Sequence, residues 1–399
     1  MNSPQTQKDP VVIVGAARTP MGAFQGDFAE LQAWELGGAA IRAAVERAGI
    51  APEKVDEVLF GNCLMAGQGQ APARQAGHAA GLPRSTGAVT LSKMCGAGME
   101  ATLLAHDQLV AGSRDVMVAG GMESMTNAPY LLKKGRGGYR MGHDKVYDHM
   151  MLDGLEDAYE PGRSMGTFGE DCAAKYQFTR EDQDKFAIAS VQRAQDATNS
   201  GAFKDEIAPV TVKTRKGEVT VSEDEGPGKA RLDKIASLRP AFKKDGTITA
   251  ASSSSINDGA AALVLMREST ARELGARPLA RIVAHATHAQ EPEWFTTAPV
   301  GATEKALKKA GWKVEDVDLW EINEAFAVVP MALMKDLNVP HDKVNVHGGA
   351  CALGHPIGAS GARILVTLLH ALQRSGKQKG LATLCIGGGE ATAMAIELV

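Results

Sequence analysis

The sequence predicts an α/β protein built from two similar halves, with a polar segment inserted into the first. Short apolar runs that indicate buried strands alternate with segments of helical period. A charged, glycine-rich stretch at residues 126–250 interrupts this alternation. Residues 116–123 align without a gap to residues 383–390 and share a Gly-Gly-x-Glu motif. We therefore expect a duplicated architecture.

The composition indicates a large folded chain and excludes several classes of partner. The 399 residues are 44% hydrophobic and 23% charged, and the net charge is −4, so nucleic acid and anionic membranes are not expected partners. No apolar run approaches the roughly 18 residues that a membrane span needs. The polar N-terminus, with Asp9, resembles neither a secretory signal nor a transit peptide. Five scattered cysteines are expected to be reduced, and the protein is expected to be soluble and cytoplasmic.

The first half begins with an apolar run at residues 11–14, which predicts a strand buried on both faces and ended by Gly15. A helix is expected over residues 36–48, closed by Gly49 as a left-handed C-cap. The remaining expected elements are a strand at 55–60, a glycine-rich loop at 61–69, a helix at 99–110 and a buried strand at 116–119.

The inserted segment is expected to hold helices near residues 163–176 and 180–200 and a hairpin around 210–221. Residues 250–266 are again small and apolar, which indicates a return to the first core. The expected division is 1–125 with 251–277 for the N-terminal half, 126–250 for the insertion, and 278–399 for the C-terminal half. The second half is expected to contain strands at 281–284, 317–322 and 383–386 and helices at 302–310 and 364–373.

Cys95 is the first candidate catalytic residue. It lies between a short apolar-polar approach and the helix expected from Met99, and Gly96 and Gly98 follow it. Unpaired N–H groups at a helix N-terminus favour an anion, so a thiolate there is expected to be stabilised and nucleophilic. The alternative is that Cys95 is a small buried hydrophobic residue, as most free cysteines are.

His347, Cys351 and His355 recur every four residues, a spacing that would suit a metal site on a helix. Glycines inside the span and Pro356 after it make a regular helix improbable, so we expect no metal site there. His355 is instead a candidate base, although most lone histidines are structural.

Asn323 and Cys385 each follow or end a predicted strand. Taken alone, Asn323 fits a strand-end turn or cap, and Cys385 fits core packing.

Together these residues carry a family resemblance. Residues 93–99 (Lys-Met-Cys-Gly-Ala-Gly-Met), 323–326 (Asn-Glu-Ala-Phe), 354–361 (Gly-His-Pro-Ile-Gly-Ala-Ser-Gly) and 385–389 (Cys-Ile-Gly-Gly-Gly) resemble thiolases in order and separation. The nearest likeness within the family is to the short-chain acetyl-CoA acetyltransferases. The resemblance implies a five-layered α/β/α/β/α fold of two similar halves, with an inserted loop domain that carries CoA-binding and tetramer contacts.

The resemblance also implies a two-stage reaction. Cys95, deprotonated by His355, takes an acyl group from acyl-CoA, and Cys385 then removes an α-proton from acetyl-CoA. The carbanion attacks the acyl-Cys95 thioester, and CoA cleaves a 3-ketoacyl-CoA in reverse. Asn323, through a held water, and His355 would form one oxyanion site, and the N–H groups of Cys95 and Gly387 the other.

Six further positions match CoA or acyl contacts of the family: Ser254, Ala250, Ala325, Phe326, Met165 and Phe295. Coenzyme A is expected as substrate and product, with no cofactor and no metal. Residues 128–151 resemble the family's tetramer-forming loop, so a homotetramer is expected. The chain departs from the family pattern at His347, Ser164 and Phe295, and the bulk of Phe295 favours short acyl chains.

Three other functions remain open from the sequence. A thiolase that acts on longer 3-ketoacyl-CoAs in fatty-acid β-oxidation would share all four motifs. A ketosynthase-like condensing enzyme is disfavoured, because the second cysteine at 385 suits a thiolase. A non-catalytic acyl-CoA-binding relative would be expected to have lost Cys95, His355 or Cys385.

Overall fold

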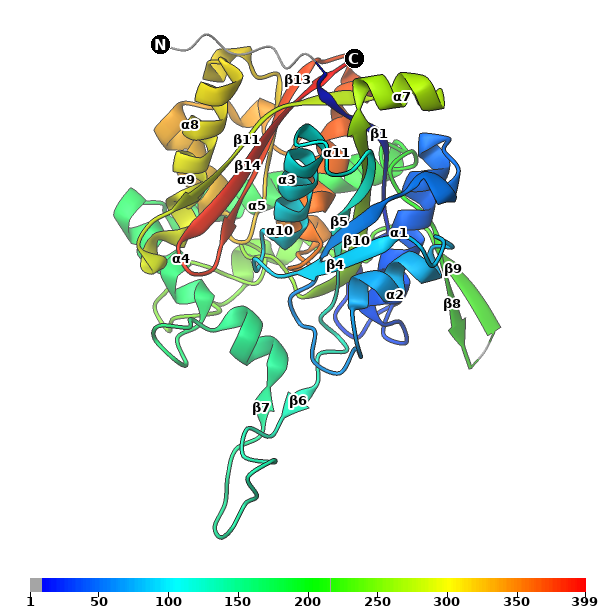
Figure 1. Ribbon diagram of the computed structural model, residues 1–399. Helices are drawn as coiled ribbons and strands as arrows, with labels where there is room; N and C mark the ends of the chain where they lie inside the picture. Colours follow the sequence, from blue (N-terminus) through cyan, green and yellow to red (C-terminus); the bar gives the residue numbers. More distant parts are fainter. Residues whose placement is uncertain (1–8, 216) are drawn as a thin grey trace.

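The computed structural model describes residues 9–215 and 217–399, and most of its strands join one hydrogen-bonded sheet of ten (Figure 1). The order is β12-β13-β14-β11-β1-β10-β5-β3-β4, and β2 pairs with β10. Val12 pairs with Arg281, and Ile13 with Ala280, where β1 meets β11 and the two halves join. The strands are β1 (Val11–Arg18), β2 (Gly22–Ala23), β3 (Glu57–Gly61), β4 (Gly87–Leu91), β5 (Val116–Ser124), β10 (Asn257–Arg267), β11 (Ala280–Ala289), β12 (Leu319–Ile322), β13 (Lys379–Ile386) and β14 (Glu390–Leu398).

Six helices form three layers around the two halves of the sheet: α1 (Ala33–Ala48), α2 (Pro72–Ala79), α3 (Ala97–Val110), α8 (Ala298–Ala310), α9 (Val328–Leu337) and α11 (Ser360–Ser375). Helices α1 and α2 pack on the outer face of the first half. Helices α3 and α11 share one core with strands of both halves, and Figure 1 shows α3 between those strands. Helices α8 and α9 cover the outer face of the second half. The expected five layers are therefore confirmed.

The apolar run of β1 is continuous because both faces of the strand are buried in a core. Val12 and Val14 enter the outer core, whereas Val11 and Ile13 enter the central one, so burial on both faces is confirmed. The predicted end at Gly15 is wrong, since the strand continues to Arg18. Gly15 instead allows close contact with α1, because a Cβ there would lie 2.2 Å from the carbonyl oxygen of Ala44.

The two halves correspond, but the aligned Gly-Gly-x-Glu motifs do not. Helix α3 begins as many residues before β5 as α11 begins before β13, and this correspondence pairs Gly120 with Thr383 rather than with Gly387. In β5 the motif is strand, whereas Gly387 and the glycines after it form the turn between β13 and β14. The duplication is real, and the short sequence match that suggested it is displaced by four residues.

Between β5 and β10 the chain leaves the sheet. Helices are found close to the two predicted positions, and a hairpin occupies the predicted stretch. The elements are β6 (Tyr130–Leu131), β7 (Tyr147–Asp148), α4 (Met165–Tyr176), α5 (Arg180–Asn199), β8 (Val210–Thr214), β9 (Gly217–Val221) and α6 (Glu225–Lys229). The remaining short elements are η1 (Pro52–Lys54), η2 (Met151–Leu155), η3 (Leu232–Ser237), α7 (Glu268–Leu274), η4 (Pro292–Thr297), η5 (Val314–Asp316), η6 (His341–Lys343) and α10 (Ala350–Leu353). Across residues 9–215 and 217–399, no helix is both long and apolar enough to span a membrane.

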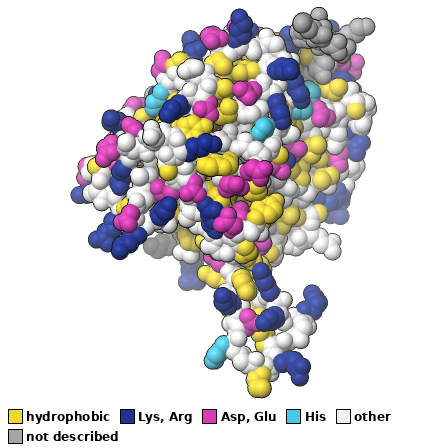
Figure 2. Space-filling model, turned by 90° about the vertical axis from the view of Figure 1, so that its left-hand side faces the viewer, with side chains coloured by type: hydrophobic (Ala, Val, Ile, Leu, Met, Phe, Trp, Pro, Cys, Tyr) yellow, Lys and Arg dark blue, Asp and Glu magenta, His cyan; other side chains and the backbone are white. Residues whose placement is uncertain are grey.

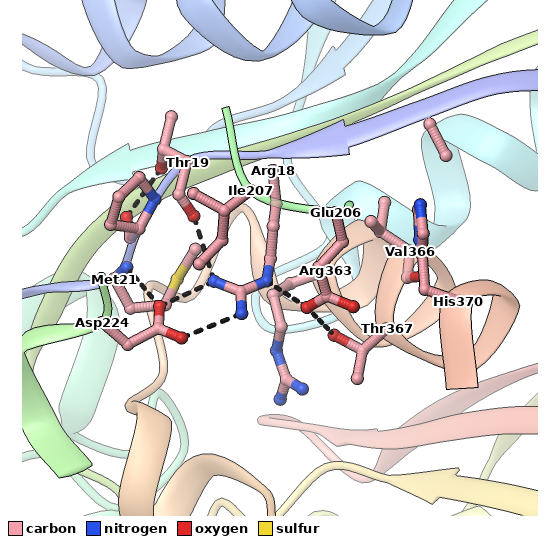
Figure 3. Close-up of polar contacts among 12 residues, drawn as sticks. Arg18, Thr19, Met21, Glu206, Ile207, Asp224, Arg363, Val366, Thr367 and His370 are labelled. Atoms are coloured by element: carbon pink, nitrogen blue, oxygen red, sulfur yellow. Dashed lines mark hydrogen bonds and ion pairs between the residues drawn. The ribbon is translucent and has the colours of Figure 1, made fainter. Parts of the chain in front are cut away.

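A buried ion-pair network fastens the inserted segment to the core (Figure 3). The Arg18 guanidinium, at the end of β1, donates two hydrogen bonds to Asp224 and one to Glu206. Thr367 of α11 donates its hydroxyl to the same oxygen of Glu206 at 3.1 Å. Strand β1, α11 and two points of the insertion are thereby held in one arrangement. Because the charges are fully buried, removing one partner would leave another uncompensated.

Candidate active site

Cys95 lies at a sharp turn between β4 and α3. Met94, the residue before it, has a φ of 45°, a left-handed conformation that non-glycine residues rarely adopt. Two bonds close the turn: the Gly96 N–H donates to Lys93 at 3.0 Å, and the Ala97 N–H donates to Met94 at 2.8 Å. The turn places Cys95 two residues before the first helical residue of α3.

Glycines around Cys95 allow three segments to meet. A Cβ on Gly96 would lie 2.3 Å from the Ile386 side chain, and one on Gly98 would lie 3.0 Å from the Gly358 carbonyl oxygen. A Cβ on Gly361 would lie 2.4 Å from the Met99 nitrogen. The start of α3 therefore contacts the end of β13 and the start of α11 too closely for larger residues.

Cys385 lies at the end of β13 and is fully buried. Burial raises the pKa of the Cys385 thiol well above its usual value, and the charge of Cys95 raises it further. Ile386, the residue after Cys385, packs so closely on Gly96, the residue after Cys95, that a Cβ on Gly96 would lie 2.3 Å from its side chain; at this separation, ionising one thiol opposes ionising the other. The predicted pair, one cysteine from each half, is brought together.

The expectation of a stabilised thiolate at Cys95 is wrong for the free protein. Burial raises the pKa of Cys95 to about 11, and the negative charge of Glu123 contributes to the rise. The N–H groups of Gly387 and of Cys95 itself bond to the sulfur and lower its pKa, but by less. Loss of water outweighs the helix N-terminus, so Cys95 is a neutral thiol that needs a base.

His355 is buried and neutral. Burial, with a smaller effect from the positive charge of Arg363, lowers the pKa of His355 to about 3. Its Nδ1 lies 2.5 Å from the Ser360 hydroxyl, which donates its proton to the Pro356 carbonyl oxygen at 2.9 Å. Both bonds form together only if Nδ1 carries the imidazole proton. Nε2 is therefore an unprotonated acceptor, and it has no hydrogen-bond partner.

Asn323 follows β12 and is fully buried, yet neither its side-chain oxygen nor its nitrogen has a partner. The next residue, Glu324, anchors this loop. Its carboxylate accepts from the Ser190 hydroxyl at 2.7 Å, the Asn345 amide at 2.7 Å and the Cys351 N–H at 2.9 Å. A buried amide without partners is a place where an ordered water fits.

Glu123 is a residue that the motifs did not single out for the site. From the end of β5 it accepts four hydrogen bonds, from the Asn62 side chain and from the N–H groups of Cys63, Leu64 and Gly358. It thereby holds the loop after β3 and the loop after His355 together. The available signal was a carboxylate at the end of an otherwise apolar buried strand.

An apolar cluster adjoins Cys385. It contains Phe295, Ala325 and Phe326, with Met165 packed against it. The Phe295 ring meets that of Phe168 edge-on, with centroids 6.1 Å apart. A Cβ on Gly387 would lie 3.3 Å from the Met165 methyl group. Four positions matched to CoA or acyl contacts thus share one apolar region beside a candidate catalytic residue.

The other matched positions lie further out. Ser254 is half-buried and donates its N–H and its hydroxyl to the Ala325 carbonyl oxygen, at 2.9 and 3.1 Å. Ala250 is exposed. Ser164 is the N-cap residue of α4 and makes no side-chain cap bond. His347 packs edge-on against Phe203 in the inserted segment, with centroids 5.9 Å apart.

The four-residue spacing of His347, Cys351 and His355 does not form a long helix. Helix α10 covers only Ala350–Leu353, and Gly354 follows it with a φ of 94°. In the described part of the chain, the one group of three His, Cys, Asp or Glu side chains that could hold a metal ion is His106, Asp107 and His285.

Comparison with known proteins decides the family. The family model described as "Thiolase, N-terminal domain" matches residues 11–269, and "Thiolase, C-terminal domain" matches residues 276–398. The chain belongs to the thiolase family. Members of this family are enzymes.

Relatives named acetyl-CoA acetyltransferase match this thiolase over nearly its whole length. Those of Chromobacterium violaceum and Rhizobium meliloti are each 52% identical; both alignments cover 97% of this chain, and they cover 99% and 98% of the respective relatives. A crystal structure of the Bacillus anthracis acetyl-CoA acetyltransferase has a TM-score of 0.95 at 43% identity and covers 98% of this chain and 99% of that one. Acat5 thiolase from Ascaris suum, solved with coenzyme A, has a TM-score of 0.93 at 41% identity, covering 98% and 100% of the two chains.

Proposed function

We propose that this thiolase is an acetyl-CoA C-acetyltransferase, which condenses two acetyl-CoA into acetoacetyl-CoA and CoA and catalyses thiolysis in reverse. The observation that carries the proposal is that Cys95 and Cys385 meet across the two halves, where Gly96 and Ile386, the residues that follow them, are in contact. One thiol is needed to hold an acyl group and another to move a proton. The names of the 52% identical relatives agree with this activity.

In the first half-reaction His355 is the base. Its unprotonated Nε2 takes the Cys95 proton as the sulfur attacks the acetyl-CoA carbonyl, and it returns the proton to the departing CoA thiolate. The developing oxyanion accepts from the N–H groups of Cys95 and Gly387, which already face the Cys95 sulfur. Coupling deprotonation to attack avoids forming a free thiolate in a buried site.

In the second half-reaction Cys385 passes its proton to His355 Nε2 and, as the thiolate, takes the α-proton of a second acetyl-CoA. Acylated Cys95 has no proton left to give, so Cys385 is then the thiol that His355 can deprotonate. The enolate oxygen accepts a hydrogen bond from the Nε2–H that His355 has gained and another from a water held on the unpartnered amide of Asn323. The enolate carbon bonds to the acetyl carbonyl carbon, the Cys95–acetyl bond breaks, and protonated His355 returns its proton to the Cys95 thiolate.

The apolar cluster with Phe295 and Met165 is proposed to receive the acyl chain. Ala325 and Phe326 line the pantetheine passage, with Ser254 and Ala250 further out, and residues 126–250 supply CoA contacts. Because the Phe295 ring is buried and already packed against Phe168, extra methylenes would overfill the cluster, which typically costs about 1–3 kcal/mol. Short chains are therefore the proposed substrates.

A homotetramer is the proposed assembly. The arm around β6 and β7 projects from the body and carries basic and apolar side chains (Figures 1 and 2). Tyr130, Leu132 and Met141 on it are exposed, Met141 by 94%, and an apolar surface of this kind favours burial against another chain. The five free cysteines agree with a reducing compartment such as the cytoplasm.

The test is CoA-dependent loss of acetoacetyl-CoA, measured beside 3-ketoacyl-CoAs of eight and ten carbons. The wild type and Cys351→Ala, a control that removes a thiol outside the proposed chemistry, are expected to cleave acetoacetyl-CoA best, and Cys95→Ala is expected to be inactive. Equal efficiency on the longer substrates would instead indicate a β-oxidation thiolase. No turnover of any substrate by the wild type would indicate a non-catalytic relative.

A further inference from the structure

Three metal-ligating side chains converge outside the proposed active site. His106 and Asp107 lie on α3, and His285 lies on β11 of the other half. His106 Nδ1 is 3.0 Å from Asp107 Oδ1, His285 Nε2 is 3.1 Å from His106 Nδ1, and His285 Nε2 is 2.9 Å from Asp107 Oδ1. The three atoms form a nearly equilateral triangle.

Protons can satisfy two edges of this triangle but not the third. Each close edge needs one hydrogen between its two atoms, and the Asp107 carboxylate brings none. If only one imidazole nitrogen carries hydrogen, the other presents a lone pair to the carboxylate. If both nitrogens carry hydrogen, both N–H groups can donate to Asp107 Oδ1, but the 3.1 Å edge between His106 and His285 then brings two donors together without a hydrogen bond. A cation at the centre would satisfy all three edges at once.

The triangle also has dimensions that fit such an ion. Zinc lies about 2.0–2.2 Å from imidazole nitrogen and carboxylate oxygen, so tetrahedral ligand atoms are about 3.3–3.6 Å apart. The edges of 2.9 to 3.1 Å need to open by only a few tenths of an ångström. We propose that His106, Asp107 and His285 bind a divalent transition-metal ion of the zinc class, which ties α3 of the N-terminal half to β11 of the C-terminal half.

The surroundings define which ion fits and how it is reached. The His106 and His285 side chains are 10% and 15% exposed, whereas that of Asp107 is 60% exposed, so water completes the coordination from the Asp107 side. Two imidazoles disfavour Mg²⁺ and Ca²⁺, which prefer oxygen ligands. Lys309 opposes binding: its Nζ donates to the His285 carbonyl oxygen at 2.9 Å. Lys309 is itself exposed, so water screens its charge and weakens this opposition.

The site is separate from the proposed chemistry. His106 lies eleven residues beyond Cys95, which at about 1.5 Å of rise per helical residue is roughly 16 Å away. The proposal departs from the expectation of a chain without metal. No spacing rule could have found the site, because its ligands come from segments 179 residues apart in the sequence.

The test uses the untagged full-length chain, stripped with a chelator and then dialysed against micromolar Zn²⁺. The number of zinc ions per chain is measured by mass spectrometry. The melting temperature is measured separately, with and without Zn²⁺ or Mg²⁺. The variants are Asp107→Asn, which keeps the side-chain shape, and His285→Gln; the matched control is His288→Gln, also on β11. Wild type and control are expected to hold one zinc per chain and to melt higher with Zn²⁺ but not with Mg²⁺.

Asp107→Asn and His285→Gln are expected to bind zinc at least about tenfold more weakly, since losing even an outer partner of a metal ligand costs roughly 10–100-fold. Thiolysis by metal-free Asp107→Asn should match the metal-free wild type. Zinc retained in full by both variants would place the ion elsewhere in the chain and overturn the proposal, as would a wild type that binds none. If His285→Gln fails to fold, Asp107→Asn decides, because its exposed side chain is not part of the core.

Discussion

Replacing Glu123 by glutamine distinguishes two effects of this carboxylate: the stability that its hydrogen bonds give the loops of the site, and its electrostatic effect on Cys95. The Glu123 carboxylate accepts four hydrogen bonds, and every donor is an N–H group. Glutamine keeps the shape but turns one acceptor oxygen into a donor. If that nitrogen replaced Oε2, the bonds from Cys63 and Gly358 would both be lost.

The other orientation costs less. With the nitrogen at Oε1, Asn62 can turn its amide and accept through its own oxygen, which has no other partner. The bond from Leu64 is then lost, together with the long bond of 3.4 Å from Asn62 to the Met122 carbonyl oxygen, and a bond to a charged group contributes about 1.5–3 kcal/mol. Relief from burying a carboxylate whose pKa burial raises to about 7 offsets part of this. At pH 8 we expect a loss of about 1–3 kcal/mol, or roughly 1–4 °C in melting temperature for a chain of this size.

The same change should make Cys95 more reactive. The charge of Glu123 raises the pKa of Cys95, so its removal should lower that pKa and speed alkylation by iodoacetamide at pH 8. The control is Glu100→Gln on α3, whose buried Oε2 has no hydrogen-bond partner. If Glu123→Gln melts at the wild-type temperature, or if its Cys95 is alkylated more slowly, the reasoning is refuted. If Glu100→Gln also melts lower and is alkylated faster at Cys95, the two effects are not specific to Glu123.

Further variants test the pocket and the base. Phe295→Met should raise the ratio of kcat/KM for six- and eight-carbon 3-ketoacyl-CoAs to that for acetoacetyl-CoA and should cost less than about 1.5 kcal/mol of stability; an unchanged ratio would remove Phe295 from the acyl site. Ser360→Ala should slow acetylation of Cys95 by part of the roughly 10²–10⁴-fold that a general base contributes, and a normal single-turnover rate would contradict the assigned tautomer. The pKa of His355, about 3 when folded, is below its unfolded value of about 6.5, so its stabilisation is present above pH 6.5 and is lost as pH falls toward 3. The stability difference between wild type and His355→Gln should therefore shrink by about 1.4 kcal/mol per pH unit in that window; a constant difference would contradict a buried neutral imidazole.

Local features of the fold could be predicted from the sequence because their causes are local. Gly49 ends α1 with a φ of 67°, as its position after a helical pattern indicates. The apolar run of β1 indicates burial on both faces, but its continuation past Gly15 depends on α1 lying against it. The sequence match that suggested the repeat is offset by four residues from the true correspondence of the elements. Short glycine motifs arise for different reasons in a strand and in a turn, so such a match can be coincidental.

The candidate site likewise has features that the sequence predicts and features that depend on the fold. Motifs alone selected Cys95, Cys385 and His355, and the fold brings the two cysteines within electrostatic reach of each other. The acidity of Cys95 could not be predicted, because burial by distant segments outweighs the local helix N-terminus. Likewise the Ser360 contact that fixes the His355 tautomer depends on how the loop folds, not on spacing.

The most direct test of the proposed division of roles is mass spectrometry of Cys385→Ala and Cys95→Ala after brief exposure to acetyl-CoA. Because His355 alone supplies the base for acylation, Cys385→Ala should carry one acetyl group on Cys95, form no acetoacetyl-CoA, and lose exchange of the acetyl-CoA α-hydrogens with deuterated water. Cys95→Ala should carry no acetyl group. A folded Cys385→Ala protein without the adduct, or one that condenses acetyl-CoA at the wild-type rate, would contradict this assignment.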